Sequence, residues 1–330
     1  MNICFIGASG HSYAVAQSAA MQNNFIKITG IAPGSDGENI EGLYDFLCKS
    51  GQPPKKYGGY IQMLDELRPD IAIVDNYYGE HAKVSAEALK RGCHVLSEKP
   101  LAATLGDLNA LKEARAQSDK KIAAMFTMRF EPEFKAAREL IQTGAIGEIR
   151  LVNAQKSYKL GTRPDFYKSR ASFGGIIPWV GIHAIDAIYF FTGKKFVYID
   201  AVCSPAGSAG FGGLEVAAAG NFISEDNIIS TVTIDYLRPA AAPSHGDDRI
   251  RIAGTAGILE IIRGKLILTD KNGEKEINLS GEKTDMFADF LDYVGSGAEN
   301  AATVLNADDA FYITETAILA QAAADKKNIK

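Results

Sequence analysis

Lys99 belongs to the tripeptide Glu98-Lys99-Pro100, which directly follows the apolar run His94-Val95-Leu96-Ser97. Such a run is typical of a buried strand, and open α/β sheets bind ligands just beyond the carboxyl ends of their parallel strands. Pro100 disfavours a helical backbone at Lys99, so we expect the ammonium group to lie at that edge of the sheet. A cation there can stabilise the alkoxide-like oxygen of an alcohol that loses hydride. The alternative is a solvated surface lysine.

His183, in the second half of the chain, is suited to move the proton of such an alcohol, because an unperturbed imidazole titrates near about pH 6.5. It follows Gly181 and opens a predicted helix over residues 184–191. Asp186 stands three residues later on the same helical face. A carboxylate there can orient the imidazole of a catalytic pair. The alternative is a core histidine that is bonded to a structural aspartate.

The turn after the first predicted strand approximates the dinucleotide fingerprint Gly-x-Gly-x-x-Gly. Gly7 matches the first glycine, whereas Ser9 and Ser12 replace the second and third. Gly7 allows the tight turn, Gly10 keeps the loop thin, and the amides that open the next helix can bind a pyrophosphate. We therefore predict that these residues and His11 contact a dinucleotide, with a hydroxyl of Ser9 or Ser12 compensating for a lost glycine. The alternative is a plain β–α turn.

Other polar residues follow predicted strands of the same half of the chain. Asn76 and Tyr77 end the strand that precedes the Lys99 strand, and we expect them to line the cofactor together with Glu98. For His81, at the start of the next helix, we expect capping and packing. The second strand lacks the acid that normally binds the ribose of NAD, and no arginine is there for the 2′-phosphate of NADP. The sequence therefore leaves NAD or NADP open.

Strand and helix patterns alternate over residues 1–126. This repeated order predicts an α/β domain with a doubly wound parallel sheet, that is, a Rossmann dinucleotide-binding domain. Its predicted strands cover residues 3–6, 25–31, 71–74, 94–97 and 121–126, and its predicted helices cover 11–23, 38–49, 60–67, 80–91 and 104–118.

Residues 127–330 follow a different pattern and predict an α+β domain for substrate binding and oligomerisation. Consecutive strands without intervening helices favour a largely antiparallel sheet, one face of which can stay exposed. The predicted strands cover residues 148–157, 196–202, 214–223, 228–235, 249–253, 258–262 and 265–268, and the predicted helices cover 133–143, 285–294 and 307–324.

The composition excludes several classes of function. The 330 residues carry a formal net charge of −5, so there is no basic surface for nucleic acid. Four scattered cysteines, without a Cys-x-x-Cys pair, indicate reduced thiols in the cytoplasm. We expect no signal peptide, and no apolar run reaches the roughly 18 residues of a membrane span. The run His245-Gly246-Asp247-Asp248 has metal-ligand residue types, but its short spacing favours a turn and no metal.

Further motifs accompany Lys99 in a fixed order. Arg129-Phe130-Glu131-Pro132 is followed by Gly144-Ala145-Ile146-Gly147-Glu148-Ile149 and then by Gly181-Ile182-His183-Ala184-Ile185-Asp186. In this order the chain resembles the Gfo/Idh/MocA family of glucose–fructose oxidoreductases and inositol dehydrogenases over nearly its whole length. The resemblance implies an NAD(P)-dependent oxidoreductase that transfers a hydride between nicotinamide and a secondary alcohol or ketone of a sugar, cyclitol or related polyol. It also implies a homodimer or homotetramer formed through the C-terminal sheet.

One position departs seriously from the family pattern. The family usually carries an aspartate four residues before the histidine, where this chain has Trp179. Trp179 offers either an aromatic face to a sugar ring or simple packing. Arg163 and Tyr167, in the loop at 161–172, either reach substrate hydroxyls or are merely soluble loop residues. We expect the Lys99 and His183 side chains to converge on one nicotinamide-facing cleft.

Two other functions stay open at this point. The altered glycine turn, the missing ribose acid and Trp179 would also suit a non-catalytic binding or regulatory protein of the same fold. A protein that retains its cofactor for redox-assisted elimination or glycoside cleavage would keep the same residues. Titration with NAD(H) and NADP(H) separates these readings from a dehydrogenase.

Overall fold

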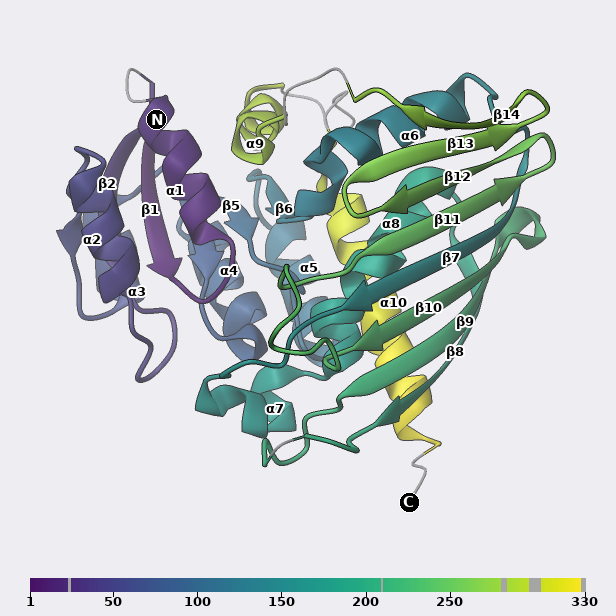
Figure 1. Cartoon of the computed structure of the whole chain (residues 1–330). Helices are drawn as coiled ribbons and strands as arrows, with labels where there is room; N and C mark the ends of the chain where they lie inside the picture. Colours follow the sequence, from purple (N-terminus) through teal and green to yellow (C-terminus); the bar gives the residue numbers. More distant parts are fainter. Residues whose placement is uncertain (23–24, 209, 280–283, 297–303, 328–330) are drawn as a thin grey trace. The chain divides into compact units, whose positions relative to one another are not determined.

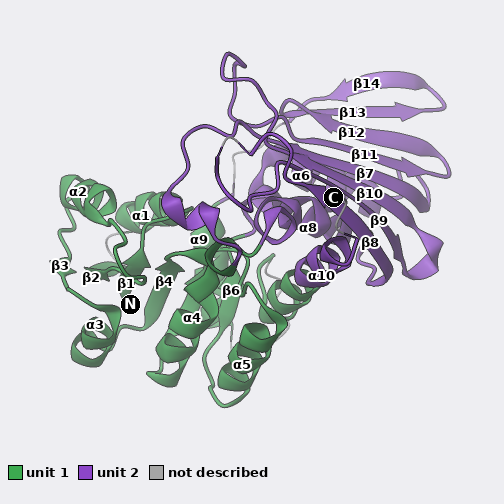
Figure 2. Ribbon diagram, turned by 90° about the horizontal axis from the view of Figure 1, so that it is seen from below, with its two compact units in different colours: residues 1–125, 171–174, 285–315 green, residues 126–170, 175–284, 316–330 purple. Residues whose placement is uncertain are grey.

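The computed structural model describes residues 1–22, 25–208, 210–279, 284–296 and 304–327 (Figure 1). Contacts within the chain divide it into two compact units, which Figure 2 shows in different colours. The chain enters the first unit three times, so the units are not simple halves of the sequence. The division into domains at residue 126 stays a prediction. Unit 1 comprises residues 1–125, 171–174 and 285–315, and unit 2 comprises residues 126–170, 175–284 and 316–330.

Unit 1 contains the parallel sheet that the sequence predicted. Its six strands lie in the order β3-β2-β1-β4-β5-β6, and every neighbouring pair is parallel. β1 and β4 are buried almost throughout, which explains their continuous apolar sequences, since both faces of a parallel sheet are covered. The strands are β1 (Asn2–Gly7), β2 (Lys27–Ala32), β3 (Lys55–Lys56), β4 (Ile71–Asp75), β5 (His94–Ser97) and β6 (Ile122–Ala124).

The helices of unit 1 begin and end where local residues allow it. α5 (Leu105–Ala116) starts after Thr104, whose hydroxyl accepts a hydrogen bond from the Asp107 amide at 3.1 Å. α4 (His81–Lys90) ends before Gly92, whose φ of +81° lets the chain turn into β5. The remaining helices of this unit are α1 (Ser12–Met21), α2 (Glu41–Lys49), α3 (Tyr60–Leu67), α9 (Met286–Gly295) and the first part of α10 (Ala307–Asp325).

Unit 2 is built on an eight-stranded sheet in the order β14-β13-β12-β11-β7-β10-β9-β8. Neighbouring strands are antiparallel except β7 and β10, which run parallel. The predicted largely antiparallel sheet is therefore confirmed, while β14 lies outside the predicted strands. The strands are β7 (Ile149–Ser157), β8 (Phe196–Ser204), β9 (Ala217–Ser224), β10 (Ile229–Asp235), β11 (Arg249–Gly254), β12 (Gly257–Ile262), β13 (Lys265–Asp270) and β14 (Gly273–Ile277).

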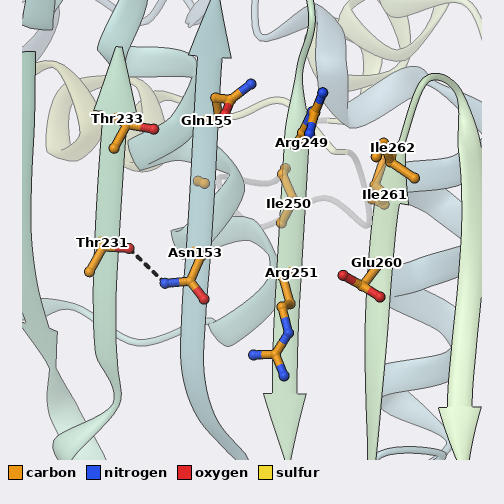
Figure 3. Close-up of a pocket in the computed structure, with 11 residues that line it drawn as sticks. Asn153, Gln155, Thr231, Thr233, Arg249, Ile250, Arg251, Glu260, Ile261 and Ile262 are labelled. Atoms are coloured by element: carbon orange, nitrogen blue, oxygen red, sulfur yellow. Dashed lines mark hydrogen bonds between the residues drawn. The ribbon is translucent and has the colours of Figure 1, made fainter.

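The two faces of this sheet have different surroundings. α6 (Pro132–Gln142) and α8 (Ile182–Thr192) pack on one face, where alternate strand residues are buried. The other face carries polar side chains from β7, β10, β11 and β12 around a groove of about 300 Å³ (Figure 3). Within that groove Asn153 donates a hydrogen bond to Thr231 at 2.7 Å, while Arg251 and Glu260 lie on neighbouring strands.

One helical stretch corrects an expectation from the sequence. Residues Arg170–Thr192 form a largely helical stretch of 23 residues, interrupted at Gly174 and Gly175. An 18-residue window within it has a mean hydropathy of 1.3, so the stretch is long and apolar enough for a membrane span. The expectation that no run reaches this length was therefore wrong. The stretch comprises α7 (Arg170–Phe173), a π-helical turn (Ile177–Gly181) and α8. Because 89% of its apolar window is buried inside the protein, we interpret it as a core helix.

Candidate functional site

The turn between β1 and α1 lies directly against the carboxyl ends of β4 and β5. Gly7 has a φ of +88°, and a Cβ on it would stand 2.5 Å from the backbone of Asn76. A Cβ on Gly10 would stand 2.7 Å from Oδ1 of Asp75 and 3.0 Å from Cδ of Glu98. Both glycines are therefore required by close approach, and the turn is thin at the place where a dinucleotide fingerprint needs it.

Asp75, the last residue of β4, holds this turn by accepting two hydrogen bonds from its backbone amides. Its carboxylate accepts a hydrogen bond from the Ser12 amide at 2.9 Å, and its carbonyl accepts one from the Ser9 amide at 2.7 Å. The side chain of Asp75 thus accepts a hydrogen bond from the free Ser12 amide at the N-terminus of α1, although Asp75 itself belongs to β4. The sequence analysis did not single out Asp75, because an acid at the end of an apolar strand gives no sign of its partner.

Glu38, in the segment after β2, is an acid that the sequence analysis did not single out. It is buried, and its Oε1 accepts hydrogen bonds from the Ser9 hydroxyl at 2.7 Å and the Ala8 amide at 3.2 Å. Its Oε2 accepts from the amides of Gly34 and Ser35 at 2.9 and 3.2 Å. Burial raises the pKa of Glu38, and these hydrogen bonds oppose the rise. A carboxylate from beyond β2 therefore does reach the glycine turn.

The carboxyl groups of Asp75 and Glu98 are fully buried and lie against Gly10. Burial and the charge of Glu98 raise the pKa of Asp75 to about 7. Burial alone would raise the pKa of Glu98 as well, but the charges of His11 and Lys99 outweigh it and lower that pKa to about 2. His11 contributes a hydrogen bond from Nδ1 to Oε2 of Glu98 at 2.8 Å. The predicted cofactor residue His11 is thus bound to the predicted cofactor residue Glu98.

Lys99 is not a solvated surface lysine in this structure. Its side chain is 3% exposed, and Nζ lies 3.4 Å from Oε1 of Glu98. The tripeptide Glu98-Lys99-Pro100 follows β5 directly, as the sequence predicted, and the Lys99–Pro100 peptide bond is cis. Leu101, which follows Pro100, donates a hydrogen bond from its amide to the hydroxyl of Thr314 at 3.2 Å. A buried ammonium group beside one carboxylate can stabilise a further negative charge on a bound oxygen.

Asn76 and Tyr77 lie beside the turn, as expected for the carboxyl end of β4. The Asn76 amide donates to the Ser35 hydroxyl at 3.0 Å, and the Tyr77 backbone amide donates to the same hydroxyl at 3.2 Å. Oδ1 of Asn76 is buried without a hydrogen-bond partner among the described residues. A buried acceptor of this kind suits a hydroxyl or amide of a bound ligand.

His81 connects the two loops that carry Asn76 and Lys99. Its Nε2 lies 2.9 Å from the carbonyl of Asn76, and its Nδ1 lies 2.7 Å from the carbonyl of Pro100. Burial lowers the pKa of His81, while both carbonyls and Glu98 raise it. The residue is fully buried at the first position of α4, so its observed role is to join the ends of two strands.

In unit 2, His183 and Asp186 are buried on α8 at the positions that the sequence predicted. The carboxylate of Asp186 is held by Arg129, which donates from Nε to Oδ1 and Oδ2 at 3.0 and 3.2 Å and from Nη2 to Oδ1 at 2.5 Å. Arg129 is 2% exposed, so this is a buried ion pair. The sequence analysis quoted Arg129 as part of a motif but did not predict the pairing. That Asp186 orients His183 stays a prediction.

The predicted substrate residues also belong to unit 2. Trp179 lies in the π-helical turn before α8 and is 9% exposed. Tyr167 is buried, and the Arg163 guanidinium lies 5.4 Å from its ring centre and donates to the Lys159 carbonyl at 3.0 Å. In the described part of the chain no group of three or more metal-ligand side chains is placed to hold a metal ion.

The residues around the turn fit a dinucleotide. Gly7 and Gly10 leave the backbone open to close approach, Glu38 supplies a carboxylate beyond β2, and Asn76 offers an unpaired buried oxygen. These are the features by which a Rossmann domain holds a pyrophosphate and a ribose.

Comparisons with known proteins agree with this geometry. Residues 1–126 match the family model described as the oxidoreductase family with NAD-binding Rossmann fold, and residues 134–260 match the model of the GFO/IDH/MocA C-terminal domain. The two models together span most of the chain. The chain belongs to the Gfo/Idh/MocA oxidoreductase family.

Individual relatives place the chain within this family. A solved structure from Thermotoga maritima, assigned provisionally as an oxidoreductase, is 42% identical, has a TM-score of 0.93 and is matched over 99% of both chains. The glycosyl hydrolase family 109 protein 2 of Akkermansia muciniphila is 27% identical over 45% of this chain and 32% of its own length. Inositol 2-dehydrogenase of Salmonella typhimurium is 24% identical over 46% of this chain and 43% of its own. The chain thus matches less than half the length of both curated relatives.

Among Gfo/Idh/MocA proteins this chain departs from the usual pattern at places that the structure partly explains. Ser9, in place of the second glycine, uses its hydroxyl to bind Glu38. Glu38 lies beyond the position directly after β2 where the family usually has its ribose acid. Its contact with the glycine turn was therefore not predicted from the sequence. Arg129 was hidden because its partner Asp186 is 57 residues away in the chain.

Proposed function

We propose that this family member is an NAD-dependent dehydrogenase or reductase that transfers a hydride between nicotinamide and a secondary alcohol or ketone of a sugar, cyclitol or related polyol. The observation that carries the proposal is the buried Lys99 beside Glu98, beneath the turn of a domain that matches the NAD-binding family model. The name of one relative, inositol 2-dehydrogenase, supports a polyol as substrate.

Each residue has a stated task in this proposal. Lys99 donates a hydrogen bond to the substrate oxygen and stabilises its alkoxide form. His183 takes the hydroxyl proton in oxidation and returns it in reduction. Asp186, held by Arg129, is a positioning residue for α8 and His183. When bound, the nicotinamide supplies the hydride acceptor or donor.

Binding contacts complete the assignment. Gly7, Ser9, Gly10, His11 and Ser12 form the turn that receives the pyrophosphate, and Asn76, Tyr77 and Glu98 line the cofactor beside it. Trp179 presents its ring to the C–H side of the substrate, while Arg163 and Tyr167 contact its hydroxyl groups.

The first experiment is titration of the purified protein with NAD(H) and NADP(H), followed by rate measurements on a panel of polyols and sugars. We expect micromolar cofactor binding and turnover that His183→Ala and Lys99→Met each lower by at least about 100-fold, the range of acid–base and electrostatic catalysis. Unchanged turnover in His183→Ala would defeat that assignment. Binding of neither cofactor would favour the non-catalytic alternative, and a cofactor that co-purifies without exchange would favour elimination or glycoside cleavage.

We further propose that Glu38 selects NAD. Its carboxylate lies at the glycine turn, where its negative charge would repel the 2′-phosphate of NADP. We expect NADH to bind at least tenfold more tightly than NADPH in fluorescence titrations, and Glu38→Gln to reduce that ratio several-fold. Asp36→Asn, at an exposed acid of the same loop, is the control and should leave the ratio unchanged. Equal affinities in the wild type would contradict this assignment.

We also propose a homodimer or homotetramer that forms through the open face of the sheet in unit 2. The cysteines Cys4, Cys48, Cys93 and Cys203 are free thiols in the structure, which suits a reducing compartment such as the cytoplasm. Small polyhydroxylated molecules are the partners that this assignment requires.

A further inference from the structure

A polar cluster in unit 2 lies beyond the carboxyl ends of β7 and β10, the parallel pair of the sheet. In that pair Lys156 is aligned with Ile234, and Lys156 points to the face that the helices cover. A Cβ on Gly181 would stand 2.5 Å from Cδ1 of Ile234, so this end of the sheet adjoins the start of α8. We call the group the Tyr236 cluster; its members are Lys156, Lys159, Arg163, Tyr236, His245 and Asp248.

The loops that carry the cluster fold back on one another. Tyr158 forms an isolated bridge with Gly246, and Lys159 forms one with Leu237. The Arg163 guanidinium lies 4.9 Å from the centre of the Tyr236 ring. Residues from both loops are therefore held together in space.

Three polar atoms of the Tyr236 cluster have no hydrogen-bond partner among the described residues. They are the hydroxyl of Tyr236, Nε of Arg163 and Oδ1 of Asp248. Tyr236 is 3% exposed, so its hydroxyl is removed from bulk solvent. A buried polar group without a partner is unfavourable, and native proteins contain few of them. Their concentration in one place indicates that something else supplies the missing hydrogen bonds.

The cluster also carries an excess of positive charge. Burial lowers the pKa of His245, and Arg163, Lys159 and Lys156 lower it further, whereas Asp248 raises it. Three cations and one carboxylate thus lie around the imidazole of His245. Asp248 already forms an ion pair with Lys156, whose ammonium group also lies 3.3 Å from Sδ of Met128.

Neighbouring carboxylates do not cancel this excess. Asp247 accepts hydrogen bonds from Arg249 at 3.2 and 2.8 Å. Asp235 accepts from the hydroxyl of Ser157 and from the amide of Leu237 at 2.7 and 2.9 Å. Both groups are engaged with other partners.

We propose that the Tyr236 cluster binds an anionic group, a carboxylate or a phosphate, on a polyhydroxylated substrate. Arg163 and Tyr236 donate hydrogen bonds to the anion, and Oδ1 of Asp248 accepts one from a neighbouring substrate hydroxyl. The anion then offsets the excess positive charge, and all three unpaired atoms are satisfied. The inference rests on the proposed function, because it names the substrate class of that reaction as a sugar acid or a sugar phosphate.

The test compares matched substrates in the NAD-loaded protein. Initial rates are measured with D-glucose, D-glucuronate and D-glucose 6-phosphate. We expect one anionic sugar to exceed glucose at least tenfold in kcat/KM, and the comparison of the two anions decides between carboxylate and phosphate. Arg163→Gln should remove most of that preference, chiefly through a higher KM for the anionic sugar.

Two further variants separate a role in recognition from a loss of folding. Tyr236→Phe retains the ring and removes only the unpaired hydroxyl, so we expect a several-fold rise in KM for the anion. Lys168→Gln, at an exposed cation of the same loop, is the matched control and should behave like the wild type. A wild type without preference for an anion, or an Arg163→Gln variant that keeps it, would overturn the proposal.

Direct binding makes the inference independent of turnover. Calorimetric titration with D-glucuronate and D-glucose 6-phosphate, with glucose as reference, is made on the wild type and on Arg163→Gln. Arg163-dependent binding of an anion without any redox activity would sustain the cluster as an anion site and defeat the proposed dehydrogenase. Turnover of neutral sugars without anion binding would support the proposed dehydrogenase and overturn the anion site.

Discussion

At the scale of single residues, Asp75 and Glu98 show how one buried site keeps two carboxyl groups in different states. Glu98 is held ionised by His11 and Lys99, and its charge, with burial, raises the pKa of Asp75 to about 7. A neutral Asp75 avoids placing a second negative charge where a pyrophosphate is expected to bind. The protonation of Asp75 is therefore linked to the stability of unit 1.

The sign of this linkage gives a prediction for Asp75→Asn. Because the folded pKa of about 7 lies above the ordinary aspartate pKa of 3.8, the stability that neutral Asp75 supplies is complete below pH 3.8 and is lost as the pH rises from there through 7. The loss approaches about 1.4 kcal/mol per pH unit. The variant keeps an acceptor for the Ser12 amide, so it should unfold at a higher temperature than the wild type at about pH 7.5 and at a similar one at about pH 4.

Thermal unfolding across this pH range checks the prediction. Asp36→Asn, at an exposed acid, is the control and should follow the wild-type curve at every pH. Parallel curves for Asp75→Asn and the wild type would show that Asp75 does not titrate in this interval.

Residues with local signals could be predicted from the sequence, and residues with distant partners could not. Lys99 was found because a strand and a proline flank it, and Gly7 because it follows the first strand. The roles of Glu38 and Asp75 depend on contacts with Ala8 and Ser12, which only the folded chain brings near. No local pattern records such a contact.

At the scale of elements, the Arg129–Asp186 pair joins α8 to the 3₁₀ turn Thr127–Phe130. Both side chains are 2% exposed, so removal of one partner leaves a buried unpaired charge. We expect Arg129→Met to lower the free energy of unfolding by about 3–5 kcal/mol. The double variant Arg129→Met/Asp186→Leu should recover most of that loss, because no charge is then buried.

Chemical denaturation of Arg129→Met, of Asp186→Leu and of the double variant measures the coupling energy between the two side chains. Additive losses would show that the pair does not act as a unit. The pH profile of kcat/KM for Asp186→Asn adds the functional readout: a shift in the His183 limb supports a positioning role, and an unchanged profile leaves Asp186 with a structural role alone.

The elements themselves were largely predictable from periodicity. α3 and β5 have the predicted bounds, because apolar spacing and flanking residues determine both ends. The parallel pairing of β7 with β10 was not predicted, since β8 and β9 come between them in the sequence and lie together on the far side of β10. Strand order depends on which faces the helices cover, and the pattern of a single strand does not contain that information.

At the scale of the whole molecule, the open face of the unit 2 sheet is the surface best suited to self-association. Tyr198, Val202 and Ile229 are 50%, 36% and 51% exposed, and the strand register places them on the face opposite α6 and α8. A stable interface needs about 800 Å² per partner, which a sheet of eight strands can supply. We expect the wild type to be a dimer or tetramer at micromolar concentration.

Ile229→Lys tests this surface, because a charge buried at an interface without a partner is strongly unfavourable. We expect the variant to dissociate to monomers, or to associate at least tenfold more weakly, in sedimentation velocity. Phe25→Lys is the matched control, since Phe25 is 78% exposed in unit 1 and lies far from the sheet of unit 2 in the sequence. A monomeric wild type, or an Ile229→Lys variant that keeps the wild-type mass, would remove the open sheet face as the site of assembly.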